Sequence, residues 1–174
     1  ELNYATGASG SATHLPGELF KSMAGVNIVR VPYKGTAPAL NDVIGGHVQV
    51  MFCTPEAVST HVRSGRVRAL AVTSAQPSAL FPGLPTVAAA AGLPGYESTV
   101  SYSFFAPAKT PAAIIKQLNL EIARVLDKPD VKERFQSGGV EVASSSPAQV
   151  TALMKAEIAR WTKVIKEANI RADN

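Results

Sequence analysis

Residues 3–11 of this chain read Asn-Tyr-Ala-Thr-Gly-Ala-Ser-Gly-Ser, and this stretch decides the fold class. Residues 2–6 have the composition of a short strand, which runs directly into a loop of small residues. The following segment, residues 13–23, has an apolar side chain at helical spacing on one face, at Leu15, Leu19, Phe20 and Met23. The stretch therefore predicts a strand, a tight loop and a helix in succession.

The same succession repeats along the first half of the chain. Residues 26–31 and 48–52 predict strands, each followed by a helix, at residues 37–44 and from Thr54-Pro55 to Arg63. The first of these helices is closed by Gly45-Gly46 and the second by Gly65, as left-handed residues commonly end helices. Residues 67–73 are almost uninterruptedly apolar, which is typical of a strand buried on both faces. Four strands alternating with three helices predict a doubly wound parallel α/β sheet.

The second half has a different rhythm, because it is rich in helices and poor in strands. After a proline-containing connector and a short helix at residues 86–91, helices are predicted to run from Pro111 to about Leu126, over residues 131–136 and from Ser146-Pro147 onward. The apolar residues of the last helix, among them Trp161, are expected to be core residues. Only residues 96–105 and 140–143 resemble strands, too few for a sheet of their own. We expect them to join a sheet built by residues outside this chain. The abrupt beginning, inside a strand and without Met, also favours a missing upstream segment.

Composition excludes several classes of function. Hydrophobic residues make up 46% of the chain and charged residues 17%, as in a globular protein. The net charge of +4 comes from scattered basic residues, so we expect no nucleic-acid partner. The single cysteine, Cys53, excludes an intramolecular disulfide and a cysteine zinc site. No apolar run approaches the roughly 18 residues of a membrane span, and no signal-peptide pattern is present, which fits a mature soluble product.

The loop Gly7-Ala8-Ser9-Gly10-Ser11 is the most informative local motif. Small residues at a strand-to-helix junction let backbone N–H groups approach an anion, and the hydroxyl groups of Ser9, Ser11 and Thr13 could add donors. Neither a Gly-Lys-Ser/Thr phosphate loop nor a GxGxxG dinucleotide motif is present. A plain tight turn with a serine cap explains the pattern equally well.

A second junction, Val31-Pro32-Tyr33-Lys34-Gly35-Thr36, follows the next predicted strand. Loops after consecutive parallel strands lie at the same carboxyl edge of the sheet, where open α/β folds bind ligands. Lys34 is expected to be exposed. Thr54 ends the third strand at the same edge and adds a further small polar group.

No combination of residues predicts catalysis or cofactor binding. His14, His47 and His61 lack the spacing and the partners of metal ligands, so we expect no metal site. No GxSxG motif is present, and Ser9 or Ser11 would need a general base that the sequence does not supply. We interpret His14 as a packed or capping histidine and Cys53 as a buried small apolar residue. We therefore expect no catalytic residue and no cofactor.

Motifs along the whole chain resemble the Bug or TctC-type solute receptors of tripartite tricarboxylate transporters. The resemblance rests on several stretches in their usual order, namely residues 3–11 with 14–15 and 17–21, 31–35 with 37–40, 45–46, 68–73, 85–87, 92–97, 105–107 with 110–111, and 161–166. The chain departs from the family pattern at Cys53, where many relatives have Asp.

This resemblance implies a periplasmic, two-lobed, periplasmic-binding-protein-like receptor that passes a small organic carboxylate to membrane transporter subunits. Candidate solutes are dicarboxylates, tricarboxylates, acidic amino acids and aromatic acids. Residues 1–98 would form the second, continuous lobe, residues 99–105 the hinge strand, and residues 106–174 the returning helical segment of a first lobe whose N-terminal part is absent. With Thr54 from the edge argument, the expected ligand-binding residues are Gly7, Ala8, Ser9, Gly10, Ser11, Thr13, Tyr33, Gly35, Thr36, Ala37 and Thr54.

Two other classes of protein remain open from the sequence. One is an enzyme that holds a phosphorylated or acyl substrate at the Gly/Ser loop, and the other is the effector domain of a transcription regulator. A consequence of the receptor interpretation is that the chain alone should self-associate through the apolar faces of its helices at residues 111–127 and 147–166.

Overall fold

The computed structural model describes residues 2–171 and divides into two compact units. The first contains the chain up to Val100 together with the chain from Trp161 onward, and the second contains Ser101–Arg160. The predicted lobe boundaries at residues 98, 105 and 106 stay a prediction. No helix in the described part of the chain is long and apolar enough to cross a membrane.

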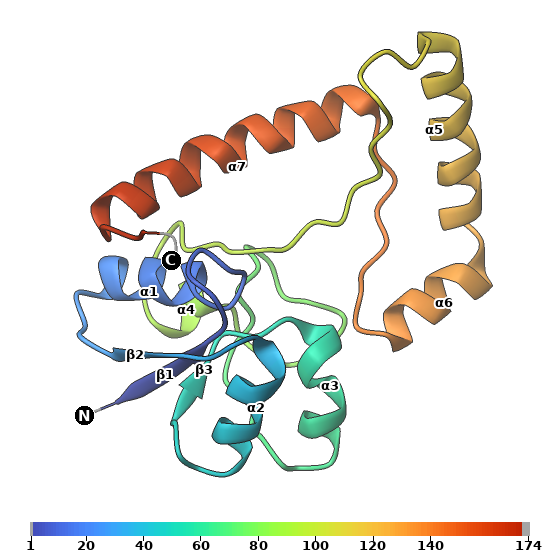
Figure 1. The fold of residues 1–174 in the computed structure, drawn as a ribbon. Coiled ribbons are helices and arrows are strands. Elements are labelled where there is room, and N and C mark those ends of the chain that lie inside the picture. The colour runs from blue at the N-terminus through green and yellow to red at the C-terminus, as the bar shows by residue number, and fades with distance from the viewer. Residues whose placement is uncertain (1, 172–174) are drawn as a thin grey trace. The chain divides into compact units, whose positions relative to one another are not determined.

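The first unit is built on a parallel sheet of three strands, β1 (Asn3–Thr6), β2 (Val29–Pro32) and β3 (Val50–Met51), in the order β2-β1-β3. Helices α1 (Leu15–Ala24) and α2 (Thr36–Ile44) follow β1 and β2, and α3 (Pro55–Arg63) follows β3. Because the chain steps from β1 to one neighbour and then crosses to the other, α1 and α2 cover opposite faces of the sheet (Figure 1). The predicted doubly wound arrangement is confirmed for these strands.

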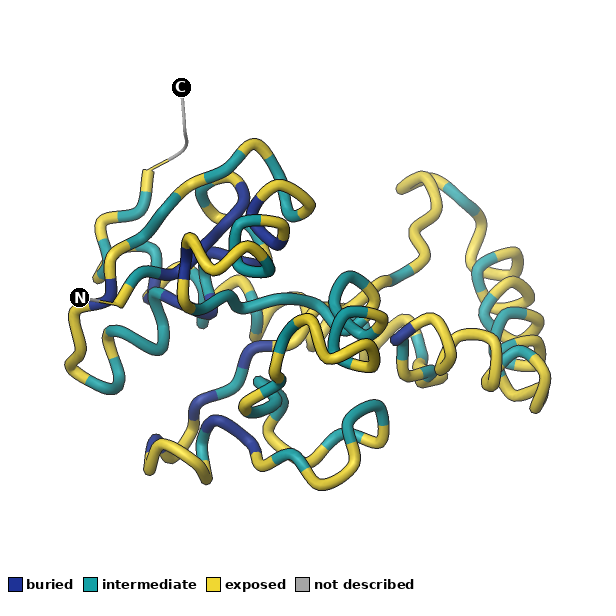
Figure 2. Tube along the Cα trace, turned by 90° about the horizontal axis from the view of Figure 1, so that it is seen from below, coloured by how far each residue is buried: buried dark blue, intermediate teal, exposed yellow. Residues whose placement is uncertain are grey.

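Alternating side chains of β1 divide the core between the two faces, as the period of a strand requires. Ala5 packs with Ala39 of α2 and with Val48 on one face. Tyr4 lies against Gly17 of α1 on the other. Tyr96 completes the α1 side of the unit, and its hydroxyl donates to the Pro16 carbonyl at 3.0 Å. Figure 2 shows that most of the buried chain belongs to this unit.

The predicted strand at residues 67–73 does not form, and this expectation is wrong. Only Val72 makes a bridge, a parallel one to Thr86, and Leu70 is 58% exposed. The backbone hydrogen bonds of the segment go to the connector instead, since Val72 N–H donates to the Pro85 carbonyl and Ser98 N–H to the Thr73 carbonyl. The short helix α4 (Val87–Ala90), predicted at residues 86–91, follows this contact, and the Thr86 side chain caps it.

The helices of the second half are confirmed, but its strands are not. Helices α5 (Ala112–Leu126), α6 (Pro129–Ser137) and α7 (Pro147–Glu167) lie close to their predicted ranges, and the last turns of α7 belong to the first unit. Residues 97–107 and 140–146 contain no strand, because no neighbouring strand in the described chain pairs with them.

Large apolar side chains are consequently exposed in the second unit, where the trace of α5 and α6 is mostly of the exposed class (Figure 2). On α7 only Val164 is buried, so the expectation that its apolar stripe forms core is wrong for most of the helix. The exposed side chains include Tyr102, Phe104, Phe105, Ile114, Leu118, Val125, Leu153, Met154 and Ile158.

Candidate ligand-binding edge of the sheet

The loops that follow β1 and β2 lie side by side at the carboxyl edge of the sheet. Tyr33 N–H donates to the Thr6 carbonyl at 2.8 Å, which continues the β1–β2 pairing to the ends of both strands. A Cβ atom placed on Gly7 would lie 3.6 Å from the Gly35 carbonyl carbon, so the two loops are in contact. The strand order reverses between β1 and β3, so the loop after β1 also borders the switch point, where open α/β folds bind ligands.

The first loop, residues 7–14, is held by hydrogen bonds within itself. Gly7 N–H donates to Thr13 Oγ1 at 2.8 Å, and Thr13 Oγ1 lies 3.0 Å from Ser11 Oγ. Gly10 N–H donates to His14 Nδ1 at 3.0 Å, and Ser11 N–H donates to the Ala8 carbonyl at 3.1 Å. Three of the backbone donors that the sequence suggested for an anion are therefore engaged inside the loop. Thr13 is buried and acts as an internal support.

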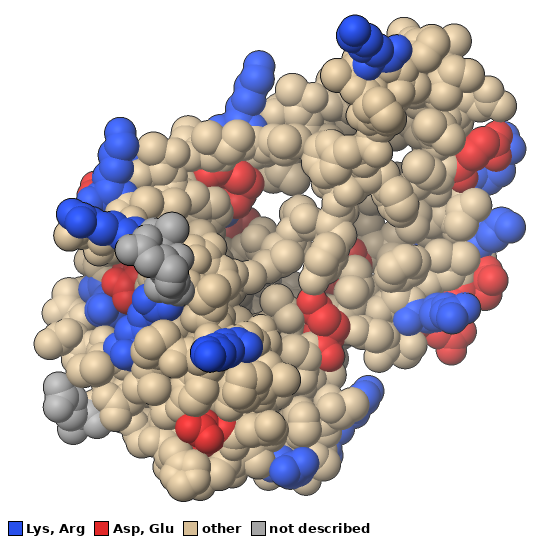
Figure 3. Space-filling view, in the orientation of Figure 1, with Lys and Arg blue, Asp and Glu red and all other residues tan. Residues whose placement is uncertain are grey.

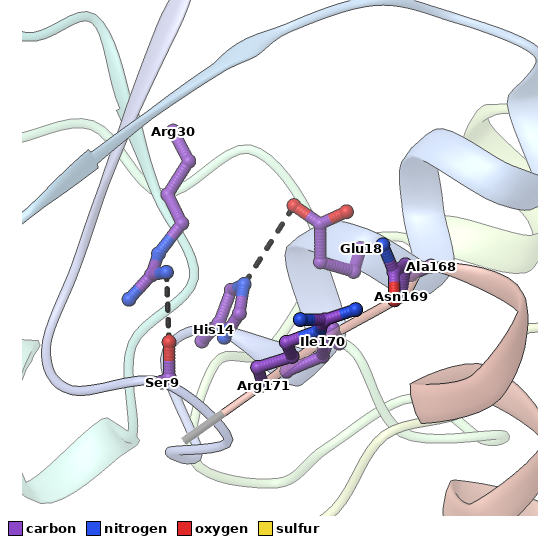
Figure 4. A pocket seen from close by; sticks show the side chains of 8 residues that line it. All are labelled: Ser9, His14, Glu18, Arg30, Ala168, Asn169, Ile170 and Arg171. Atoms are coloured by element: carbon purple, nitrogen blue, oxygen red, sulfur yellow. Dashed lines mark hydrogen bonds and ion pairs between the residues drawn. The ribbon is translucent and has the colours of Figure 1, made fainter. Parts of the chain in front are cut away.

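Arg30 of β2 holds this loop through three hydrogen bonds, a role that was not predicted from the sequence. Its Nε donates to Thr6 Oγ1 at 3.0 Å, Nη1 to Ser9 Oγ at 2.9 Å and Nη2 to the Gly7 carbonyl at 3.3 Å. Figure 4 shows the guanidinium group directed at Ser9. The available signal was an arginine within the apolar strand Val29-Arg30-Val31, where alternation places it on the α1 face with Tyr4.

A buried polar cluster joins the loop to α1. His14 is 3% exposed, as expected of a packed histidine, and its Nε2 lies 3.7 Å from Glu18 Oε1. Glu18 also accepts hydrogen bonds from the Tyr4 hydroxyl and from Lys21 Nζ. Burial alone opposes ionisation of Glu18, but these two hydrogen bonds, with the charge of Lys21 and, when its ring is protonated, that of His14, hold its pKa below the ordinary value.

A shallow hollow opens beside this cluster. It is lined by Ser9, His14, Glu18, Arg30 and residues 168–171, all of which belong to the first unit (Figure 4). Ser9 and His14 therefore line a hollow that is open to solvent.

The second loop presents the start of α2. Gly35 has φ 121° and ψ 175°, a conformation that is essentially restricted to glycine, and no side chain caps the helix. Thr36 and Ala37 occupy the first turn of α2, where backbone N–H groups have no intrahelical acceptor. The N-terminus of α2 is therefore the better anion donor of the two loops.

The Tyr33 side chain packs along α2 and points away from the first turn of that helix. Its hydroxyl donates to Asp42 Oδ2 at 2.6 Å, and that hydrogen bond raises the pKa of Tyr33. Its ring packs against the core cluster that contains Ala39. The Tyr33 hydroxyl is therefore occupied by its hydrogen bond to Asp42 of α2. Lys34 is exposed, as expected.

The third strand contributes Thr54 at the start of α3. Thr54 has an extended backbone and is followed by Pro55 at the first helical position, as the sequence indicated. Cys53 beside it is half-buried, and burial raises the pKa of its thiol to about 11, so the thiolate is disfavoured at neutral pH. This agrees with the interpretation of Cys53 as an unreactive packing residue.

Charges do not gather into one continuous patch on the face shown in Figure 3, where basic and acidic side chains are dispersed among neutral ones. Within residues 2–171, no group of three or more His, Cys, Asp or Glu side chains is arranged to hold a metal ion. The polar groups at the carboxyl edge thus include hydroxyls, backbone amides, the exposed Lys34 and the supporting Arg30, which suit hydrogen bonding to an anion.

The fold and this edge define the class of protein, an α/β binding domain of the periplasmic-binding-protein type. The chain belongs to the TctC family, described as the tripartite tricarboxylate transporter family receptor, whose model matches residues 1–170.

Solved structures agree with this assignment. The chain is 40% identical to R. palustris Rpa4515 with adipate, with a TM-score of 0.85, covering 98% of this chain and 56% of that one. It is 31% identical to the periplasmic binding protein BugD, with a TM-score of 0.79 and coverage of 99% and 58%. It is 31% identical to MatC (Rpa3494) from Rhodopseudomonas palustris with bound malate, with a TM-score of 0.74 and coverage of 94% and 56%.

These findings confirm the predicted family and the fold class, and one of the matched structures is a periplasmic binding protein. The chain spans about half the length of most of the curated relatives it matches.

Proposed function

We propose that this chain is the solute-binding part of a periplasmic receptor that captures a small organic carboxylate and delivers it to the membrane subunits of a tripartite tricarboxylate-type transporter. The observation that carries the proposal is the contact between the loops after β1 and β2 at the carboxyl edge of the sheet, next to the β1/β3 switch point. The family membership supports a receptor, and the adipate and malate in similar structures support a carboxylate ligand.

The geometry favours capture by hydrogen bonds over capture by a direct charge pair. The first turn of α2 offers amide donors, and the positive end of the helix dipole favours an anion there. Ser9 Oγ accepts a hydrogen bond from Arg30, which polarises the hydroxyl for donation to a carboxylate. Charge-assisted hydrogen bonds contribute roughly 1.5–3 kcal/mol each, so a few of them suffice for micromolar binding.

A dicarboxylate is the preferred ligand class within the proposal. Adipate and malate each carry two carboxyl groups, and the edge described here provides one wall for one such group. Closure of a second wall over the solute would be driven by tighter binding to the closed state, as in any ligand-induced population shift.

The proposal is tested by calorimetry with adipate, malate, citrate, aspartate and benzoate on the intact protein. We expect binding of at least one carboxylate and none of the corresponding neutral amide. The double variant Ser9→Ala, Ser11→Ala should weaken the affinity by about tenfold or more, because two hydroxyl donors are lost.

Ser22→Ala is the matched control, since Ser22 is an exposed serine of α1 away from both loops. It should bind as the unmodified protein does. Absence of heat with every acid, or equal affinity of the double variant and the control, would contradict the proposed site.

A further inference from the structure

We propose that His14 positions the Gly/Ser loop for carboxylate binding and does so only as the neutral imidazole, so that binding weakens when His14 takes up a second proton. This inference rests on the proposed function, and it names the residue that regulates the same site. It follows from the contacts of the two ring nitrogens.

The hydrogen bond from Gly10 fixes the tautomer of His14. Gly10 N–H donates to Nδ1 at 3.0 Å, and this requires a lone pair on that nitrogen. The remaining proton of the neutral ring is therefore on Nε2, which faces Glu18 Oε1 at 3.7 Å. The ring thus connects the middle of the loop to the carboxylate at the start of α1.

Gly10 lies between the two serines of the Gly/Ser loop. It has φ +75°, a left-handed conformation, and it lies between Ser9 and Ser11, whose hydroxyls are proposed to contact the solute. The side chain of His14 is 4% exposed, so the ring has little freedom to move away from Gly10. The hydrogen bond therefore sets the direction in which this part of the loop faces.

Protonation of Nδ1 would remove the acceptor and place two N–H donors opposite each other. The charged groups around the ring act in opposite directions. Glu18 favours the imidazolium form, whereas Arg30 and Arg171, which line the same hollow, and Lys21, which pairs with Glu18, oppose it. Tyr4 is buried, and its pKa is raised, by burial and then by Glu18, so it stays neutral.

The hollow gives the proton a route to the ring. His14 lines it together with Ser9 and Glu18, although the residue is buried overall (Figure 4). Histidine is the side chain that ordinarily changes charge between about pH 5 and pH 8. Acidification would exchange the Gly10 hydrogen bond for a stronger His14–Glu18 ion pair and release the backbone at Gly10.

The experiment measures amide hydrogen exchange of the ¹⁵N-labelled 174-residue chain without ligand, from about pH 8 to about pH 5.5. The protection factor of Gly10 should fall on acidification by roughly two- to twelvefold, the worth of one hydrogen bond. Ser11 is the internal control, because its N–H donates to the Ala8 carbonyl, which does not titrate in this range.

Two variants distinguish the loss of the hydrogen-bond acceptor at residue 14 from a change in the volume of its side chain. His14→Asn keeps an acceptor near the place of Nδ1 and should retain Gly10 protection at every pH. His14→Gln lacks an acceptor there and should lose the protection at every pH. His47→Asn, the same change at an exposed histidine, should titrate like the unmodified chain.

Adipate binding to the intact protein provides the functional readout. For each protein, the dissociation constant at low pH is divided by that at high pH. This ratio should be roughly two- to twelvefold larger for the unmodified protein than for His14→Asn. Comparing the two proteins cancels the titration of adipate itself, because it affects both equally. If adipate does not bind, the proposed function fails while the Gly10 measurement still decides this inference. Gly10 protection that is independent of pH, or a pH response retained in His14→Asn, would overturn it.

Discussion

Glu18 is the residue on which most of the polar contacts at the start of α1 converge. It accepts hydrogen bonds from Tyr4 and Lys21, and it faces His14. These groups together outweigh the effect of burial, so the pKa of Glu18 is lowered. A carboxyl group whose pKa is lowered on folding stabilises the folded state above its unfolded pKa. That contribution is lost as the pH falls from about 4.3, the unfolded value, through the folded pKa.

We therefore expect Glu18→Gln to lower the free energy of unfolding at neutral pH, by about 1.5–3 kcal/mol, and to flatten the loss of stability in acid. Urea unfolding followed by circular dichroism from neutral pH to acid measures both effects. Glu121→Gln is the control, because Glu121 forms an exposed ion pair with Arg124 and should change stability by less than about 1 kcal/mol. A Glu18→Gln variant as stable as this control would show that the cluster contributes little.

At the residue scale, the sequence predicted which loops meet but not how their donors are used. Small residues at Gly7–Ser11 and at Gly35 are visible signals because they sit at strand ends. Arg30 reaches the loop from a strand 21 to 24 residues further along the chain, and His14 reaches Gly10 from the turn that leads into α1. No local sequence pattern predicts such contacts. The ligand-binding roles of Gly7–Ser11, Thr13, Tyr33, Gly35–Ala37 and Thr54 stay predictions.

At the scale of elements, α1 approaches β1 closely at Gly17. A Cβ atom on Gly17 would lie 2.9 Å from Tyr4 Cδ2, and Tyr4 is fully buried. Glycine at this helical position therefore allows α1 to lie directly on the aromatic ring.

Gly17→Ala is expected to lower stability by about 1–3 kcal/mol through overpacking, even though alanine favours helix by about 1 kcal/mol. Thermal unfolding measures the change. Ser22→Ala, at an exposed position of the same helix, is the control for helix propensity and should be neutral or slightly stabilising. Stability equal to that of the control would indicate that the ring moves aside at no cost.

Elements with a strong local pattern were predicted well, and elements that need a partner were not. Helices α1 to α7 follow from apolar spacing, caps and prolines. Residues 67–73 and 96–105 have apolar, strand-like sequences, but a strand exists only where another backbone pairs with it, and here the first segment pairs with the connector. Periodicity cannot distinguish these cases.

For the whole molecule, the exposed apolar side chains of α5 and α7 predict self-association of this chain in isolation. Leu118 is 46% exposed and Ile158 is 63% exposed, and such surfaces are normally covered. Sedimentation velocity should show a concentration-dependent increase in mass. The double variant Leu118→Lys, Ile158→Lys should reduce it, whereas Ser137→Lys, an exposed position on α6, should not. A chain that is monomeric at all concentrations would contradict this prediction.

The internal hydrogen bonding of residues 7–14 has a consequence for kinetics. A segment whose conformation is already fixed in the empty protein loses little conformational entropy when a solute binds. Binding at this loop therefore needs no rearrangement of the loop after the solute arrives. Association should then be rapid and only weakly dependent on temperature, and discrimination among solutes would be expressed in how slowly each one leaves.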